Sequence, residues 1–175
     1  MDKRLDLDKL KYPIGKFTAP EELSREELNR CISDICLLPE KIITSMDNLD
    51  EDLLDVAYRP DGWTRRQVVH HLADSHMNAY VRFKLALTED NPTIKPYGQD
   101  AWAELQDSVN YPIEASLKII DGVHSRWGHL LDSMLEADFK RTFFHPESKK
   151  LYTLEYTTAL YAWHGNHHLA QISQR

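Results

Sequence analysis

Four long segments of the chain carry apolar residues three and four positions apart, which is the spacing of one face of an α-helix. The first begins after Ser24, whose hydroxyl forms with the carboxylate of Glu27 the pattern of a capping box, and it runs to about Leu49. Pro39 lies inside this segment, so a kink or a split of the helix is expected there. An acidic connection follows and ends in a turn at residues 59–62.

The other three helices have clear boundary signals of their own. A second capping box, Thr64-Arg65-Arg66-Gln67, opens a helix that should reach about Leu87. Pro112 suits the first position of a third helix, because its missing N–H has no partner there in any case. The last helix is predicted to begin near Leu154, with Thr153 as its cap, and to run to the C-terminus.

The connecting segments complete the predicted architecture. Residues 90–111 should form a loop with one short helix near 101–105, and residues 139–153 a short hairpin or an irregular loop. The first 22 residues contain two prolines and a glycine and show no helical period, which indicates an extended arm. The prediction is therefore a single all-α domain over 1–175, a four-helix bundle with an extended N-terminal arm.

Composition and charge narrow the function classes. The chain has 175 residues and a formal net charge of −7, which disfavours a general nucleic-acid binder because phosphates attract excess positive charge. No apolar run approaches the roughly 20 residues of a membrane span, and the N-terminus shows no signal peptide. Cys31 and Cys36 are too few for a disulfide framework, so we expect both to be reduced and the protein to be cytoplasmic.

Histidine is the outlier of the composition, with nine residues. His164 and His168 lie four apart on a predicted helix and therefore share one face, where two imidazoles can bind one metal ion. His167 also shares a face with His164 and is an alternative to His168. A third ligand must come from another helix, because a catalytic zinc site commonly uses three protein ligands and a water.

The helix that opens at Thr64 offers three candidates for this third ligand. Measured around the helix axis from Leu72, at the centre of the apolar stripe, His70 lies about 160° away and should point to solvent. His71 lies about 100° away, at the edge of the stripe, whereas His76 lies about 40° away and should be a hydrogen-bonded core histidine. We therefore expect His71 to complete a three-histidine site between two helices.

Three further residues near His71 are candidates for the site. Asp74 could orient a ligand imidazole, although an ion pair with His70 on the surface is slightly favoured. Ser75 and Asn78 lie on the His71 side of the helix and are candidate pocket residues. No convincing general base emerges. The remaining histidines are expected to be structural or to face solvent; they are His124, His129 and His145.

Motifs along nearly the whole chain carry a resemblance to a known family. They are Tyr12-Pro13-Ile14-Gly15, Gly62-Trp63-Thr64, the segment from Arg66 to Asn78, Phe144-His145-Pro146, and Tyr161-Ala162-Trp163-His164 with His167-His168. In them the chain resembles the YfiT branch of the DinB-like superfamily, described as metal-dependent hydrolases and more recently as bacillithiol transferases. The resemblance implies an up-down-down-up four-helix bundle with a divalent metal. By motif match, the family's three ligands fall on His71, His164 and His168.

The resemblance also implies a function. It favours transfer of a low-molecular-weight thiol such as bacillithiol to an electrophilic substrate, with one divalent ion per chain, zinc first and nickel as the alternative. The same histidines would serve a hydrolase that uses a metal-bound hydroxide, or a non-catalytic metal-binding stress protein. The expected partners are a small thiol and an electrophile, with no nucleic acid and no membrane, and the family's habit suggests a homodimer. Gly165 departs from the family's motif and could leave space beside the metal.

Overall fold

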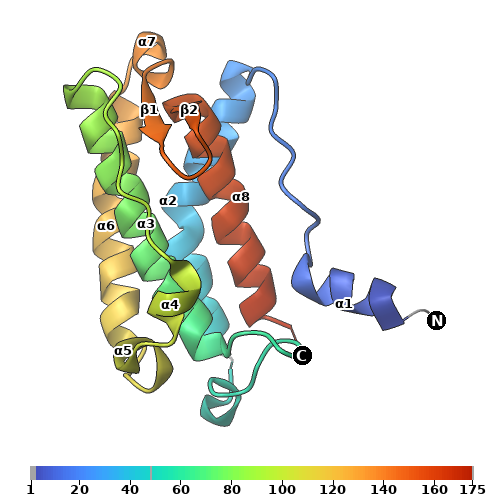
Figure 1. Cartoon of the computed structure of the whole chain (residues 1–175). Helices are drawn as coiled ribbons and strands as arrows, with labels where there is room; N and C mark the ends of the chain where they lie inside the picture. Colours follow the sequence, from blue (N-terminus) through green and yellow to red (C-terminus); the bar gives the residue numbers. More distant parts are fainter. Residues whose placement is uncertain (1–2, 48, 175) are drawn as a thin grey trace.

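Four long helices form the bundle in the computed structural model, which describes residues 3–47 and 49–174 (Figure 1). They are α2 (Arg25–Asp47), α3 (Arg65–Thr88), α6 (Glu114–Ser133) and α8 (Leu154–Ile172). In Figure 1, α2 and α8 run downward whereas α3 and α6 run upward, which is the up-down-down-up arrangement. Helices α3 and α6 are therefore parallel neighbours, as are α2 and α8. The predicted all-α four-helix bundle is confirmed.

The predicted helix starts are present. The backbone N–H of Ser24 donates to the Glu27 carboxylate at 2.8 Å, and the N–H of Glu27 donates to the Ser24 hydroxyl at 3.2 Å. Thr64 forms a reciprocal capping box at the start of α3, and Thr153 accepts from the backbone at the start of α8. Each cap satisfies backbone N–H groups that have no partner inside the helix. Helix α2 continues through Pro39 without a split.

A long crossover joins the parallel helices α3 and α6. It contains α4 (Gln99–Ala103) and α5 (Gln106–Val109), so the structure has two short helices where the sequence predicted one. Helix α6 begins two residues after the predicted Pro112. Because α3 ends at the top of the bundle and α6 begins at the bottom, the crossover must run the length of α3, and it lies against that helix (Figure 1).

The N-terminal segment corrects one prediction. Residues 1–2 lie outside the described residues, but α1 (Lys3–Lys11) is helical where an extended arm was expected. The segment consists of Lys, Arg, Leu and Asp without a proline, a composition that permits a helix without a wide apolar stripe. Its last turn is held by α8 and the residues that follow it, because the side chains of Gln171 and Gln174 donate to the carbonyls of Lys11 and Leu10. Residues 12–24 contain no helix or strand, with a turn at 13–14, so this part of the predicted arm is non-helical as expected.

The upper end of the bundle carries the small sheet. After α7 (Glu136–Phe139), strands β1 (Thr142–His145) and β2 (Lys150–Thr153) form an antiparallel hairpin in which Phe143 is opposite Tyr152. The hairpin is one of the two forms predicted for this segment. At the lower end, the 3₁₀ turn η1 (Glu51–Leu53) lies in the acidic connection. Among the described residues, no helix is both long and apolar enough to cross a membrane.

Candidate metal centre

Three imidazoles from two helices converge in the lower half of the bundle. His71 comes from α3, and His164 and His168 from consecutive turns of α8. One ring nitrogen of each lies within 4.8 Å of the others, and the Nε2 atoms of His71 and His164 are 3.3 Å apart. Two nitrogens bound to one tetrahedral zinc at about 2.0–2.1 Å would also lie about 3.3 Å apart. The spacing therefore suits a small divalent ion.

Burial keeps these imidazoles neutral. It lowers the pKa of His71 to about 4, and it holds the pKa values of His164 and His168 well below their usual range. The neighbouring rings add to the effect on His164 and His168, since two positive imidazoliums side by side would repel. A neutral imidazole is the form that binds a metal. At pH 7 the three rings thus need not lose charge before binding an ion.

A line of hydrogen bonds extends from this cluster across the core to α2. Pro39 has no N–H, so the carbonyl of Ile35, four residues earlier, receives no bond from it within the helix. The Nδ1 atom of His124 lies 2.6 Å from that carbonyl oxygen. His124 Nε2 lies 2.9 Å from His76 Nδ1, and His76 Nε2 lies 3.1 Å from His164 Nδ1. Helix α2 is thereby connected to a ring of the cluster.

This line determines where each proton lies. Burial lowers the pKa values of His76 and His124, so both rings are neutral and carry one proton each. A carbonyl only accepts, so His124 carries its proton on Nδ1 and accepts at Nε2. His76 then donates from Nδ1 and accepts at Nε2, and His164 must donate from Nδ1. The Nε2 atom of His164 is left as a bare lone pair facing the cluster.

Gln171 determines the tautomer of His168, a second ring of the cluster, in the same way. Its amide nitrogen donates to the Lys11 carbonyl, so its oxygen faces His168 Nδ1 at 2.8 Å. His168 therefore donates from Nδ1 and presents a bare Nε2. The same amide nitrogen lies 3.0 Å from His167 Nε2, and this engages His167 away from the cluster. His168 rather than His167 belongs to the group of three.

His70 corrects a prediction. It was expected to point to solvent, yet only 5% of its surface is exposed. Its Nδ1 lies 2.7 Å from the Ser116 hydroxyl, and its Nε2 lies 3.0 Å from the Tyr111 carbonyl oxygen. The predicted position of His70 around the axis of α3, away from the apolar stripe, was correct. The end of the crossover and the first turn of α6, however, cover that side of α3. His70 therefore joins α3 to the end of the crossover and to α6 by hydrogen bonds rather than facing water.

The three candidates next to His71 have different surroundings. Asp74 is half-buried, and burial together with Asp107 raises its pKa to about 6. Neither of its expected roles is seen, because among the described residues no hydrogen bond joins its carboxylate to an imidazole, and both nitrogens of His70 are occupied. Ser75 is buried, with its hydroxyl 3.5 Å from the Tyr161 hydroxyl. Asn78 donates to the Asp74 carbonyl.

The remaining three histidines differ from one another. His124 is buried in the hydrogen-bonded line, and His129 is exposed on α6. His145 is half-buried at the end of β1. His124 is structural and His129 faces solvent, in agreement with the sequence prediction. The hydrogen-bonded link from His124 to the cluster was not predicted.

Gly165 has a packing role rather than the expected one. A Cβ atom at this position would lie 2.5 Å from Cδ2 of the buried Leu38. The glycine therefore lets α8 approach α2 closely, and it does not open space beside the cluster. This contact explains why a residue with poor helix propensity stands in the middle of α8.

Two cavities open onto the cluster, and both include His164 in their walls. The first, of about 440 Å³, lies beside α1 and the turn before α3, and its lining includes Tyr12, Arg59 and Trp63. The second, of about 650 Å³, lies between α4, the hairpin and α8, and Ser75 forms part of its wall. Asn78 lines neither of them. The ring of Trp63 also packs 4.9 Å from that of His71.

Comparison with known proteins agrees with this geometry. Residues 38–172 match the model of the DinB superfamily. The chain belongs to this superfamily. A Bacillus mycoides protein is 50% identical over 94% of each chain, and the Bacillus subtilis protein YfiT is 45% identical over 94% of this chain and 93% of its own; both are provisionally named metal-dependent hydrolases. The structure of YfiT matches with a TM-score of 0.91 at 45% identity, covering 94% of each chain.

The YfiT structure is described as a probable metal-dependent hydrolase with an unusual four-helix bundle topology. That description fits the parallel α3 and α6 of this DinB-superfamily chain. Sequence reasoning missed the partners of the cluster, above all His124 and Gln171. A proline four residues after Ile35 indicates that the Ile35 carbonyl lacks its helical hydrogen bond. Its donor, His124, comes from another helix and cannot be identified from the local sequence.

Proposed function

We propose that the chain is a metal-dependent enzyme that joins a low-molecular-weight thiol, of the bacillithiol type, to an electrophilic substrate. The observation that carries the proposal is that two separate cavities share His164 in their walls, within a cluster of three neutral imidazoles. Two cavities suit a reaction that brings two molecules together. The names of the relatives support metal dependence.

The chemistry of the cluster suits this reaction. His71, His164 and His168 would hold a divalent ion without reducing its charge, and that ion would supply the positive charge that favours the thiolate form of a thiol below its usual pKa of about 8.5. In the proposed transfer the thiolate sulfur would attack the electrophilic carbon, a C–S bond would form, and the leaving group would depart with the electron pair of the broken bond. The thiol proton would be released to solvent.

The chain's own residues hold this arrangement. The orientation of the His164 ring is set by His76 and, through it, by His124. The orientation of the His168 ring is set by Gln171. The ring of Trp63 packs on His71 and covers it from the side of the first cavity. No carboxylate among the described residues joins the group of three, so the charge of an ion there would not be reduced by a protein ligand.

Hydrolysis is the second candidate, because the names of the relatives point to it. The residues required would be the same, with water in place of the thiol. The two reactions differ in what they consume, since only transfer depends on the concentration of a thiol. The third possibility, a non-catalytic metal-binding protein, predicts metal binding without turnover.

The deciding experiment measures both reactions on one preparation. Chelator-stripped, zinc-loaded and nickel-loaded protein would be assayed with bacillithiol, cysteine and thioglycerol against a chromogenic aryl chloride, and with a nitrophenyl ester without thiol. We expect metal-dependent conjugation that persists from pH 8 toward pH 6.5, where the uncatalysed reaction slows. Metal-dependent ester cleavage without thiol would instead support the hydrolase. Metal binding with neither reaction would support the binding protein.

Metal identity and assembly belong to the same proposal. We expect one divalent ion per chain, zinc first and nickel second, because three imidazoles suit both metals. Elemental analysis of protein purified without added metal tests this stoichiometry. Light scattering of the same sample tests the expected homodimer.

A further inference from the structure

The second cavity contains a cation that the cluster does not use. Arg82 lies on α3, three helical turns beyond His71, and its side chain lines the cavity of about 650 Å³ that also reaches His164. The residue is half-buried, and among the described residues it belongs to no ion pair. A half-buried guanidinium without a carboxylate partner, in a cavity that leads to a reaction site, suits an anionic ligand.

Hydrogen-bond donors surround this guanidinium. Its Nη1 lies 3.5 Å from the Tyr161 hydroxyl, which in turn lies 3.5 Å from the Ser75 hydroxyl. Tyr97 also lines the cavity, and burial raises its pKa to about 12, so it stays a phenol that can donate. His145, from the hairpin, has a buried Nδ1 with no hydrogen-bond partner among the described residues. Such unmade bonds are costly unless a ligand or water completes them.

We propose that this cavity binds a carboxylate group of a substrate, with Arg82 as its counterion and the phenol of Tyr161 or Tyr97 as a second donor. The planar fork of a guanidinium matches the two oxygens of a carboxylate. The inference rests on the proposed function, because it states that one of the two reacting molecules is a carboxylic acid. It adds to that function a substrate class and a residue that selects it.

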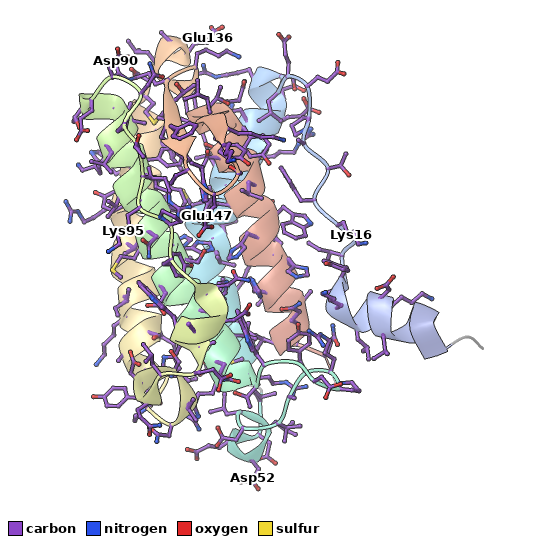
Figure 2. All side chains as sticks on the ribbon, viewed as in Figure 1. Lys16, Asp52, Asp90, Lys95, Glu136 and Glu147 are labelled. Atoms are coloured by element: carbon purple, nitrogen blue, oxygen red, sulfur yellow. The ribbon has the colours of Figure 1, made fainter. Side chains whose placement is uncertain are left out.

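The acidic residues of the cavity do not cancel this cation. Glu147 lies on the turn of the hairpin and Asp100 on α4, and both are exposed, so water screens their charges. Figure 2 shows Glu147 over the middle of the bundle, where the hairpin turn points toward α4. Asp74 lies near Tyr97 but is not part of the cavity wall, and its pKa of about 6 leaves it mostly ionised at pH 7. Among the residues that line the cavity, Arg82 is therefore the half-buried side chain that carries a full charge.

Direct binding to the metal-free protein tests the site independently of catalysis. Succinate and its uncharged diamide would be titrated into chelator-stripped, full-length protein while the NMR signal of the Arg82 Nε–H is followed. We expect succinate to shift this signal, the diamide not to shift it, and Arg82→Gln to bind succinate about tenfold more weakly. The matched control is Lys84→Gln, which removes the same charge from an exposed position on α3; its affinity should equal that of the wild type.

Several outcomes would overturn the proposal. These are equal binding of succinate and the diamide, an unshifted Arg82 signal at saturation, and wild-type affinity in Arg82→Gln. Should Arg82→Gln fold poorly, Arg82→Lys retains the charge but loses the fork, and it should bind succinate with an intermediate affinity. Because no metal, thiol or turnover is needed, a failure of the transferase proposal would leave these results interpretable.

A second arm finds which substrate carries the carboxylate. On the zinc-loaded protein, Arg82→Gln should raise the KM of mercaptosuccinate about tenfold while leaving that of thioglycerol unchanged, if the acid is the thiol. If the acid is the electrophile, the KM of a carboxylate-bearing aryl chloride should rise instead. Unchanged KM values for both acids would contradict the site even if conjugation itself is observed.

Discussion

The Nε2 atom of His76, which is buried in the core of the bundle, lies 3.1 Å from the Nδ1 atom of the half-buried His164. This contact is the last step of the line that begins at the Ile35 carbonyl, four residues before Pro39. Its consequence is chemical, because it places the proton of His164 on the nitrogen that faces away from the cluster. Pro39 on α2 thus helps to hold His164 on α8, a candidate metal ligand, in the tautomer whose Nε2 is free to bind.

Replacing His76 tests that line. In His76→Phe the Nδ1–H of His164 loses its acceptor, and the ring is no longer held in one tautomer and orientation. We expect zinc affinity to fall by about 10- to 100-fold, the usual effect of removing the partner of a ligand imidazole. A competition titration against a chromophoric chelator measures it, with His129→Gln on the exposed side of α6 as the control. Unchanged affinity would show that the line is only structural.

Alanine substitution should affect zinc binding at the three candidate ligands but not at the neighbouring His70. His71→Ala, His164→Ala and His168→Ala should each abolish stoichiometric zinc binding in calorimetry, because two imidazoles rarely suffice for a catalytic-type site. His70→Ala should keep the metal but lower the free energy of unfolding by about 1–3 kcal/mol, since it leaves the Ser116 hydroxyl and a carbonyl unpaired. Loss of metal in His70→Ala, with retention in His71→Ala, would contradict this assignment.

Two glycines in the bundle should respond to alanine in opposite directions. In Gly165→Ala the new methyl group would meet Leu38 at 2.5 Å, so we expect a loss of about 1–3 kcal/mol in the free energy of unfolding. Gly122 on α6 has no atom within 4 Å of the added Cβ position, and Gly122→Ala should gain about 0.5–1 kcal/mol from helix propensity. Urea unfolding measures both. Stabilisation of both variants would mean that α2 and α8 do not pack this closely.

The stability of the metal-free protein should fall in mild acid. Burial lowers the pKa of several histidines in the folded chain, whereas the unfolded chain takes up their protons near pH 6.5. The unfolded state then binds more protons, so the stability is fully present above about pH 7 and is lost progressively as the pH falls from about 6.5 toward the lowered pKa values of the folded state. The histidines concerned are His70, His71, His76, His124, His164, His167 and His168.

Urea unfolding of chelator-stripped protein at pH 7.5 and pH 5.5 measures this effect. Each of these histidines can contribute up to about 1.4 kcal/mol per pH unit below its unfolded pKa. Asp74 opposes the trend, since its pKa of about 6 in the folded state means that protonation there favours folding. We expect a net loss greater than about 2 kcal/mol at pH 5.5. Equal stability at both values would show that the histidine rings are hydrated or already charged.

Local signals in the sequence were sufficient for most of the secondary structure. Apolar spacing and the caps at Ser24, Thr64 and Thr153 predicted the four long helices, because capping bonds join residues only three positions apart. The same spacing placed His164 and His168 on one face. Helix α1 was missed because a short helix held at its end by Gln171 and Gln174 needs no apolar stripe of its own.

Tertiary structure decided what those side chains face. Helical angle alone placed His70 toward solvent, and only the crossover required by two parallel helices buries it. The choice of His168 over His167 and the tautomers of the candidate ligands depend on Gln171, His76 and His124, which reach them from other turns and other helices. Periodicity determines a direction around one helix axis, whereas burial, hydrogen bonding and the positions of protons depend on which remote segment lies in that direction.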